Sequence, residues 1–245
     1  FDATTSMYRN DIVAKALHTD RHIQLPTITS PQKFGGVTKT GIPIAAGAGD
    51  NAAAALGVQA EPGDVVVSLG TSGTAFAVSH TSTHDATGAV AGFADATGKF
   101  LPLVCTLNAA RILDAATQIL GKSHDEIGAL ALSAQPGAHG LTLLPYFEGE
   151  RTPNRPDATG VLSGMTLANS NPADMARAYI EGMLSGLADA VHALEEAGAD
   201  IRRRRACCPG PSSRARGPAC SGRSRENGSA RYKRADRAAC RPCSS

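Results

Sequence analysis

The composition of the chain changes abruptly after Ile201. Residues 1–201 carry 11 Lys and Arg against 20 Asp and Glu, a net charge of −9, whereas residues 202–245 carry 13 against 2, a net charge of +11. The whole-chain value of +2 averages these two unlike parts. Residues 202–245 contain no Leu, Ile, Val, Met, Phe or Trp, so they cannot bury a hydrophobic core and are predicted to be disordered. We therefore expect a folded body over 1–201 and a basic tail over 202–245.

The residue types of the tail indicate how it arose. Arg, Ala, Pro, Gly, Ser and Cys dominate it, as expected when GC-rich coding DNA is translated out of frame. We therefore interpret 202–245 as the product of a frameshift. A basic tail by itself favours contacts with nucleic-acid phosphates, but Tyr232 is its only aromatic residue and the body is acidic. Nucleic-acid binding is therefore not expected.

The body has the composition of an intracellular protein. Cys105 is its only cysteine, so no disulfide framework is expected and a reducing compartment is favoured. No apolar run reaches the length of a membrane span, and the first residues lack the basic and apolar regions of a leader peptide. We expect a soluble, cytoplasmic protein without membrane contact. The spacing of its cysteine and histidine residues predicts no metal site.

Apolar periodicity predicts an α/β body. Two hairpins are expected, one from strands 64–69 and 74–79 and one from strands 89–94 and 99–105, so the sheet is antiparallel or mixed. The clearest helix is 172–197, in which apolar residues recur every three or four positions between Asn171 and Gly198. Shorter elements are expected at 11–18, 42–46, 51–56, 106–120, 123–134 and 141–147, with 26–41 as a loop.

Asp50 lies between a short apolar strand with the turn Gly47-Ala-Gly49 and an alanine-rich helical run. Asp is a preferred N-cap residue, so one interpretation is a helix cap. The other is a general base, because a carboxylate on a rigid, glycine-bounded turn can accept a proton from a substrate hydroxyl. The turn alone does not separate these interpretations.

Gly70-Thr-Ser-Gly73 joins the two strands of the first hairpin. Glycines let backbone N–H groups approach an anion, and the two hydroxyls add hydrogen-bond donors without bulk, so the tetrapeptide suits a phosphate. A tight hairpin also requires glycines without any ligand. Both interpretations stay open for this motif by itself.

Together these two motifs and four later segments resemble the FGGY carbohydrate kinases and, within that family, the xylulokinases. The resemblance begins in 46–57 and 62–74, and it continues in the same order through 92–98, 101–110, 144–154 and 160–181. It covers about 1–201 and is specific because six segments agree in order and spacing. Tyr179 is bulkier than the small residue usual in the family, and Arg151 is expected to be structural, paired with Glu148 or Glu150.

The resemblance implies an α/β kinase of the actin/hexokinase-like, ribonuclease-H-like fold, with a mixed sheet and flanking helices. It implies transfer of phosphate from ATP, with Mg²⁺, to a sugar hydroxyl, with D-xylulose as the favoured sugar. Asp50 falls on the family's catalytic base, and Asn51 lies beside it at the sugar. The implied ATP-binding and phosphate-binding positions are Gly70, Thr71, Ser72, Gly73, Asn108 and Ala109. A homodimer is expected for the intact protein.

The same resemblance predicts three regions. Residues 1–62 correspond to the end of the sugar-binding N-terminal domain, 63–201 to a truncated ATP-binding C-terminal domain and 202–245 to the tail. The resemblance also implies that most of the N-terminal domain is not part of this sequence. It places Arg202-Arg-Arg-Arg-Ala-Cys-Cys where the family has a Gly-Gly adenosine loop. We therefore expect the chain by itself to be inactive. Two alternatives stay open: a non-catalytic fragment or pseudogene product, and a kinase for ribulose, gluconate or glycerol.

Overall fold

The chain is centred on a five-stranded mixed sheet. A computed structural model describes residues 1–19 and 21–207. The strand order is β5-β6-β4-β3-β9, in which β9 runs parallel to β3 and every other pair is antiparallel. Both predicted hairpins and the mixed sheet are therefore confirmed. The strands are β3 (Asp64–Leu69), β4 (Gly73–Ala77), β5 (Ala91–Ala94), β6 (Phe100–Thr106) and β9 (Arg203–Cys207).

Side chains alternate between the two faces of this sheet, as the period of two in a β-strand requires. On one face Val66 and Phe76 pack against α2 (Asp50–Gly57). On the other face Val65 packs against the C-terminal part of α5 (Pro172–Glu196). The sheet is thus covered by a helix on each side, which buries its β-branched strands.

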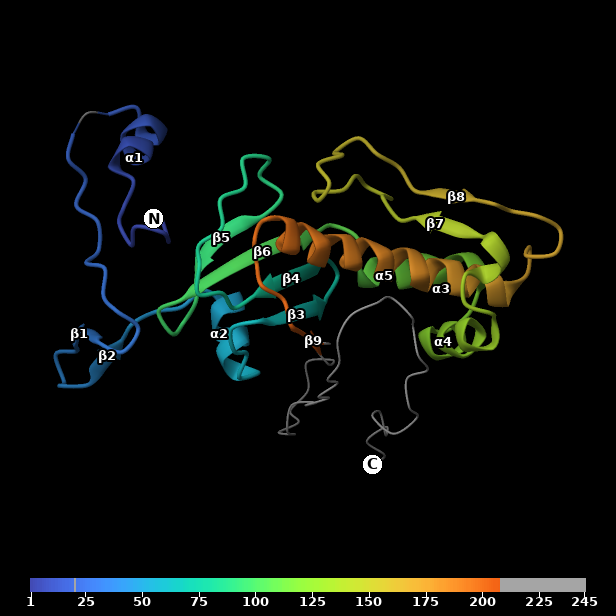
Figure 1. Cartoon of the computed structure of the whole chain (residues 1–245), viewed down its shortest axis with the longest axis horizontal. Helices are drawn as coiled ribbons and strands as arrows, with labels where there is room; N and C mark the ends of the chain where they lie inside the picture. Colours follow the sequence, from blue (N-terminus) through green and yellow to red (C-terminus); the bar gives the residue numbers. More distant parts are fainter. Residues whose placement is uncertain (20, 208–245) are drawn as a thin grey trace.

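Helix α5 connects the sheet to a second core. Figure 1 shows it running from the sheet toward α3 (Ala110–Leu120) and α4 (His124–Ser133). Its N-terminal half packs with these two helices, beside the 3₁₀ turn Ala138–Gly140 and the pair β7 (Thr142–Leu144) and β8 (Val161–Ser163). Among the described helices, none is long and apolar enough to cross a lipid bilayer.

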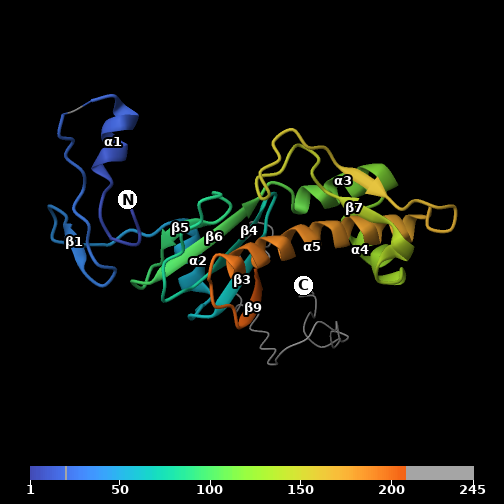
Figure 2. The ribbon, with the colours of Figure 1, turned by 45° about the horizontal axis from the view of Figure 1, so that its top comes forward.

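The N-terminal segment contributes little to either core. It holds α1 (Asn10–Leu17), no residue of which is buried, and the antiparallel pair β1 (Phe34–Val37) and β2 (Pro43–Ala45). In both views these elements lie at the end of the molecule opposite α4 (Figure 1, Figure 2). The predicted loop 26–41 therefore contains a strand, because Phe34–Val37 pairs with the strand expected at 42–46.

Local sequence signals gave the helix ends correctly where a side-chain cap is present. Ser123 and Glu126 form both hydrogen bonds of the predicted capping box at α4. The Asn171 side chain accepts from Ala173 N (3.1 Å) and Asp174 N (3.0 Å) at the start of α5. The helix expected from 106 instead begins at Ala110, because β6 continues to Thr106 through its pairing with Gly73.

The prediction of a disordered tail was wrong for its first residues. Arg203–Cys207 form β9, whose backbone pairs with β3 from Asp64 to Ser68. Its arginines are accommodated by ion pairs, since Arg203 and Arg205 both reach Asp64. An edge strand needs no apolar face when its charges are neutralised in this way. The rest of the predicted tail, 208–245, lies outside the described residues.

Candidate functional site: the β3–β4 hairpin and the start of α3

The tip of the β3–β4 hairpin presents free hydrogen-bond donors. The strands pair up to Leu69 and Gly73, and Gly70 N donates to Ser72 O at 3.1 Å across the turn. Thr71 and Ser72 are exposed. Within the described part of the chain, their N–H groups and hydroxyls donate to no protein acceptor. The tip can therefore offer two backbone N–H groups and two hydroxyls to an anion.

The segment 106–110, which leads into α3, is hydrogen-bonded to the base of the hairpin turn. Ala110 N donates to Gly70 O at 2.9 Å, and Gly73 N donates to Thr106 Oγ1 at 3.2 Å. The two ends of the hairpin turn are thus bound to the two ends of the segment 106–110. The hairpin and the start of α3, both predicted from the sequence as phosphate or nucleotide sites, lie together in the fold.

Asn108 and Ala109 lie in the protein interior beside the hairpin. Asn108 is 3% exposed and Ala109 is fully buried. Asn108 Nδ2 donates to Gly149 O (2.8 Å) and to Glu150 Oε2 (3.0 Å), while its Oδ1 is buried without a partner among the described residues. Their predicted place in the nucleotide site stays a prediction. In this structure neither residue presents an open surface.

Asp50 is the first residue of α2 and not its cap. The N-cap position is Gly49, so the cap interpretation of Asp50 was wrong. Its Oδ1 accepts from Asn51 N (2.8 Å) and Asn51 Nδ2 (3.1 Å). The side chain is exposed, and its Oδ2 has no hydrogen-bond partner in the described residues. A free carboxylate oxygen is therefore available to a substrate, with Asn51 orienting the group.

The structure does not bring Asp50 and the hairpin tip into direct contact. Helix α2 packs on the sheet face opposite α5 through Ala52 and Ala55. No hydrogen bond or ion pair in the described residues joins Asp50 to Thr71 or Ser72. The two predicted groups therefore belong to one α/β unit, in which α2 and the β3–β4 hairpin share a core.

Glu150 is a buried carboxylate that sequence reasoning did not place at the site. It is 3% exposed, and it accepts from Leu107 N (2.6 Å), Asn108 Nδ2 (3.0 Å) and Arg151 N (2.8 Å). The predicted pairing of the Arg151 side chain was wrong, because only its backbone reaches Glu150. The signal in the sequence was an acidic residue inside a segment that resembles a family motif.

Glu148, the other predicted partner of Arg151, pairs elsewhere. Its carboxylate lies 2.7 Å from Arg111 Nη1 on α3. The Glu148 side chain is 77% exposed, so this pair contributes little to stability. The two glutamates of the loop thus have different environments. Glu148 is exposed to solvent, whereas Glu150 is buried beside the segment 106–110.

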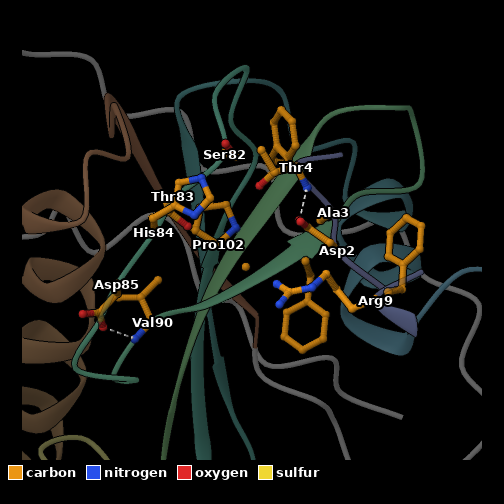
Figure 3. Close-up of a pocket in the computed structure, with 14 residues that line it drawn as sticks. Asp2, Ala3, Thr4, Arg9, Ser82, Thr83, His84, Asp85, Val90 and Pro102 are labelled. Carbon is orange, nitrogen blue, oxygen red and sulfur yellow. Dashed lines mark hydrogen bonds between the residues drawn. The ribbon is translucent and has the colours of Figure 1, made fainter. Parts of the chain in front are cut away.

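A separate pocket of about 400 Å³ lies near the chain start. Figure 3 shows Asp2, Thr4 and Arg9 on one side of it and the 82–90 loop on the other. Two carboxylates of the lining are satisfied by nearby backbone groups: Thr4 N donates to Asp2 (2.9 Å) and Val90 N to Asp85 (2.8 Å). These backbone N–H groups lower the pKa of Asp2 and Asp85. Thr83 Oγ1 is buried without a partner among the described residues. The pocket contains none of the predicted site residues.

Known proteins resemble a large part of the chain. The model of the C-terminal domain of the FGGY family of carbohydrate kinases matches 65–205. A xylulose kinase from Streptomyces coelicolor is 41% identical over 184 residues, which are 72% of this chain and 36% of that protein. A xylulose kinase from Streptomyces rubiginosus is 45% identical over 149 residues, which are 58% of this chain and 29% of that protein.

A solved structure extends the likeness to the fold. The crystal structure of xylulose kinase from Bifidobacterium adolescentis has a TM-score of 0.79 and 44% identity, over 87% of this chain and 46% of that chain. The predicted actin/hexokinase-like α/β fold is therefore confirmed. The chain spans less than half the length of these relatives. The family match covers more than half of the chain, and we conclude that the chain belongs to the FGGY family of carbohydrate kinases.

Proposed function

We propose that this chain carries the phosphate-binding hairpin and the general base of an ATP-dependent sugar kinase. The observation that carries the proposal is the hairpin tip, where Thr71 and Ser72 leave four donors unused on a turn braced from behind. In this proposal 63–201 bind the nucleotide and 1–62 form the edge of the sugar site. Family membership supports the chemistry, and the free donors support its location.

The hairpin tip fits a phosphate group. Backbone N–H groups and hydroxyls on a glycine-bounded turn bind anions without bringing a bulky side chain near them. Bound ATP supplies the phosphoryl group, and the hairpin orients its phosphates and neutralises part of their charge. Positioning is the main contribution of the protein to this reaction, so the bracing of the tip matters as much as its donors.

The described residues would bind Mg²⁺ only together with the phosphates of the nucleotide. They contain no group of three His, Cys, Asp or Glu side chains that would hold a metal. Mg²⁺ commonly keeps several waters and is held by one or two carboxylates together with substrate phosphates. The metal would therefore arrive with ATP and be held mainly by its phosphates.

Asp50 acts as the general base in this proposal. A sugar hydroxyl is a weak nucleophile, and its proton leaves as the new bond to phosphorus forms. Asp50 Oδ2 is free to accept that proton, while Asn51 holds Oδ1. A positioned base contributes typically about 10²–10⁴-fold in rate.

D-Xylulose is the proposed sugar. Both Streptomyces relatives described above and the Bifidobacterium structure are named xylulose kinases. Ribulose, gluconate and glycerol are the competing acceptors, because they require the same phosphoryl transfer. The chain spans 36% of the S. coelicolor protein, so we propose that it does not turn over ATP by itself.

A chimera tests the function of the chain's own residues. The 184 aligned residues of the S. coelicolor xylulose kinase are replaced by their counterparts from this chain, and sugar-dependent ADP release is measured with D-xylulose, D-ribulose, gluconate and glycerol. The proposal predicts turnover with D-xylulose above the other three, and background rates for the 245-residue chain by itself. A folded chimera without sugar-dependent ADP release contradicts the proposed function.

A further inference from the structure

The Glu150 carboxylate binds the residues just before α3 through hydrogen bonds. Its Oε1 accepts from Leu107 N at 2.6 Å and from Arg151 N at 2.8 Å, and its Oε2 accepts from Asn108 Nδ2 at 3.0 Å. The residue lies 43 positions from Leu107 in sequence. Hydrogen bonds to a charged acceptor are about twice as strong as neutral ones, and burial excludes competing water. The carboxylate therefore ties the loop 147–155 to the segment 106–110.

The N-terminus of α3 has no side-chain cap of its own. Its N-cap residue is Ala109, which offers no acceptor. The first N–H of the helix, at Ala110, donates instead to Gly70 O of the hairpin at 2.9 Å. The position of the hairpin thus depends on where the segment before α3 is held.

The loop that carries Glu150 is itself restrained. Glu150 N donates to Arg155 O (2.9 Å) and Arg155 N donates to Glu150 O (2.8 Å), and Gly149 N donates to Ala158 O (2.9 Å). Gly149 has a φ of +79°, and a Cβ there would collide with the Pro156 carbonyl. The carboxylate therefore projects from a fixed backbone and not from a freely moving loop.

We propose that Glu150 is the positioning residue of the hairpin tip: its buried carboxylate fixes residues 107–108, which set Thr106 and Ala110, which in turn hold Gly73 and Gly70. The inference rests on the proposed phosphate-binding role of the hairpin for its functional meaning. Glu150 contacts no atom of the hairpin tip in this structure. It acts through the segment 106–110.

Amide hydrogen exchange, followed by NMR on the full 245-residue chain, tests the positioning directly. In Glu150→Ala the amides of Gly70, Gly73 and Ala110 are expected to exchange at least about tenfold faster, because three charged hydrogen bonds are lost. Glu150→Gln keeps the two bonds to Oε1 and turns an N–H toward Asn108, so an intermediate increase is expected. If Glu150→Ala fails to fold, the exchange rates in Glu150→Gln test the positioning role by themselves.

Two controls separate positioning from general stability. Glu148→Gln changes the neighbouring exposed glutamate and is expected to leave these amides unchanged. The amides of 179–191 in the middle of α5 are expected to keep their protection in both Glu150 variants. Unchanged exchange at Gly70 and Gly73 overturns the inference, and so does an equal acceleration in α5.

A binding measurement keeps this inference distinct from the proposed function. The dissociation constant for ADP, with and without Mg²⁺, is measured for the unmodified chain and for both Glu150 variants. If the unmodified chain binds ADP, Glu150→Ala is expected to weaken binding at least about tenfold, and unchanged affinity overturns the inference. If it does not bind ADP, as the replaced adenosine loop allows, the exchange data alone decide the role of Glu150.

Discussion

Gly73 lies directly against Leu187, at the point where the hairpin turn meets α5. A Cβ built on Gly73 would lie 2.5 Å from Leu187 Cδ2 and 2.6 Å from Thr106 Oγ1. Real Cβ atoms do not approach other atoms so closely, so a side chain at position 73 requires the Leu187 and Thr106 side chains to move. The glycine predicted for phosphate contact is therefore also required by packing.

Gly73→Ala is expected to destabilise the chain by about 1–3 kcal/mol, because the packed side chains of Leu187 and Thr106 must shift to accommodate the methyl group. Urea denaturation measures the change. Gly128→Ala on α4 is the matched control: an added Cβ meets nothing within 4 Å, and alanine in a helix interior stabilises by about 0.5–1 kcal/mol. Equal effects of the two substitutions contradict the close packing at Gly73.

The ion pairs of β9 predict that Arg203 and Arg205 contribute more to stability than Arg202 and Arg204. Arg203 Nε and Arg205 Nη2 lie 2.5 and 2.9 Å from the carboxylate of Asp64, which is fully buried. Replacing both arginines by glutamine leaves that buried carboxylate without its charged partners and is expected to cost about 1–3 kcal/mol. Arg202 and Arg204 pair with exposed acids, so the corresponding double glutamine variant is expected to cost less than about 1 kcal/mol.

The environment of Asp174 predicts that part of the fold's stability is lost at low pH. The Asn171 side chain, and then His139, hold the pKa of the Asp174 carboxyl below its usual value. A carboxyl with a lowered folded-state pKa stabilises the fold above its unfolded pKa, and this stability is lost as the pH falls through the folded pKa. Asp174→Asn is therefore expected to be less stable than the unmodified chain at pH 7, with the difference shrinking below about pH 4. A constant difference in urea midpoint from pH 7 to pH 3 contradicts this.

The frameshift interpretation predicts what the DNA encodes. Family similarity ends at residue 205, close to the change in composition after Ile201. Translation of the same DNA in the other two frames is expected to yield an apolar strand followed by a glycine pair. If neither frame contains one, the tail is an authentic part of the protein and the interpretation is wrong.

The elements that sequence patterns predicted well are those with local causes. Strand 64–69 and the helix after Asn171 depend on alternation, periodicity and caps within a few residues, and the structure has both. The capping box at Ser123 and Glu126 is equally local. Such signals are readable because the atoms that interact are near one another in the chain.

The features that the sequence did not predict depend on distant partners. β9 is held beside β3 by ion pairs from its arginines to Asp64, some 140 residues earlier in the chain. Glu150 acts on Leu107, 43 residues away. The sequence also left open whether Asp50 is the cap of α2. Gly49 and Asp50 are both favourable N-cap residues, and only the backbone conformation of Gly49 separates them.

The central claim is that Asp50 is a general base, and its clearest test is Asp50→Asn in the S. coelicolor chimera. Because Gly49 is the cap, asparagine at position 50 loses only the favourable charge in the first turn of α2, about 0.3–1 kcal/mol. The melting temperature is therefore expected to stay nearly normal.

The measurement is kcat for D-xylulose at saturating Mg-ATP, in the chimera with and without Asp50→Asn. Loss of the base predicts a fall in kcat by about 10²-fold or more. Asn51→Ala removes a side-chain bond to Asp50 but keeps the carboxylate, so it is expected to lower kcat less. A kcat for Asp50→Asn close to that of the unmodified chimera, with normal melting, contradicts the catalytic role of Asp50.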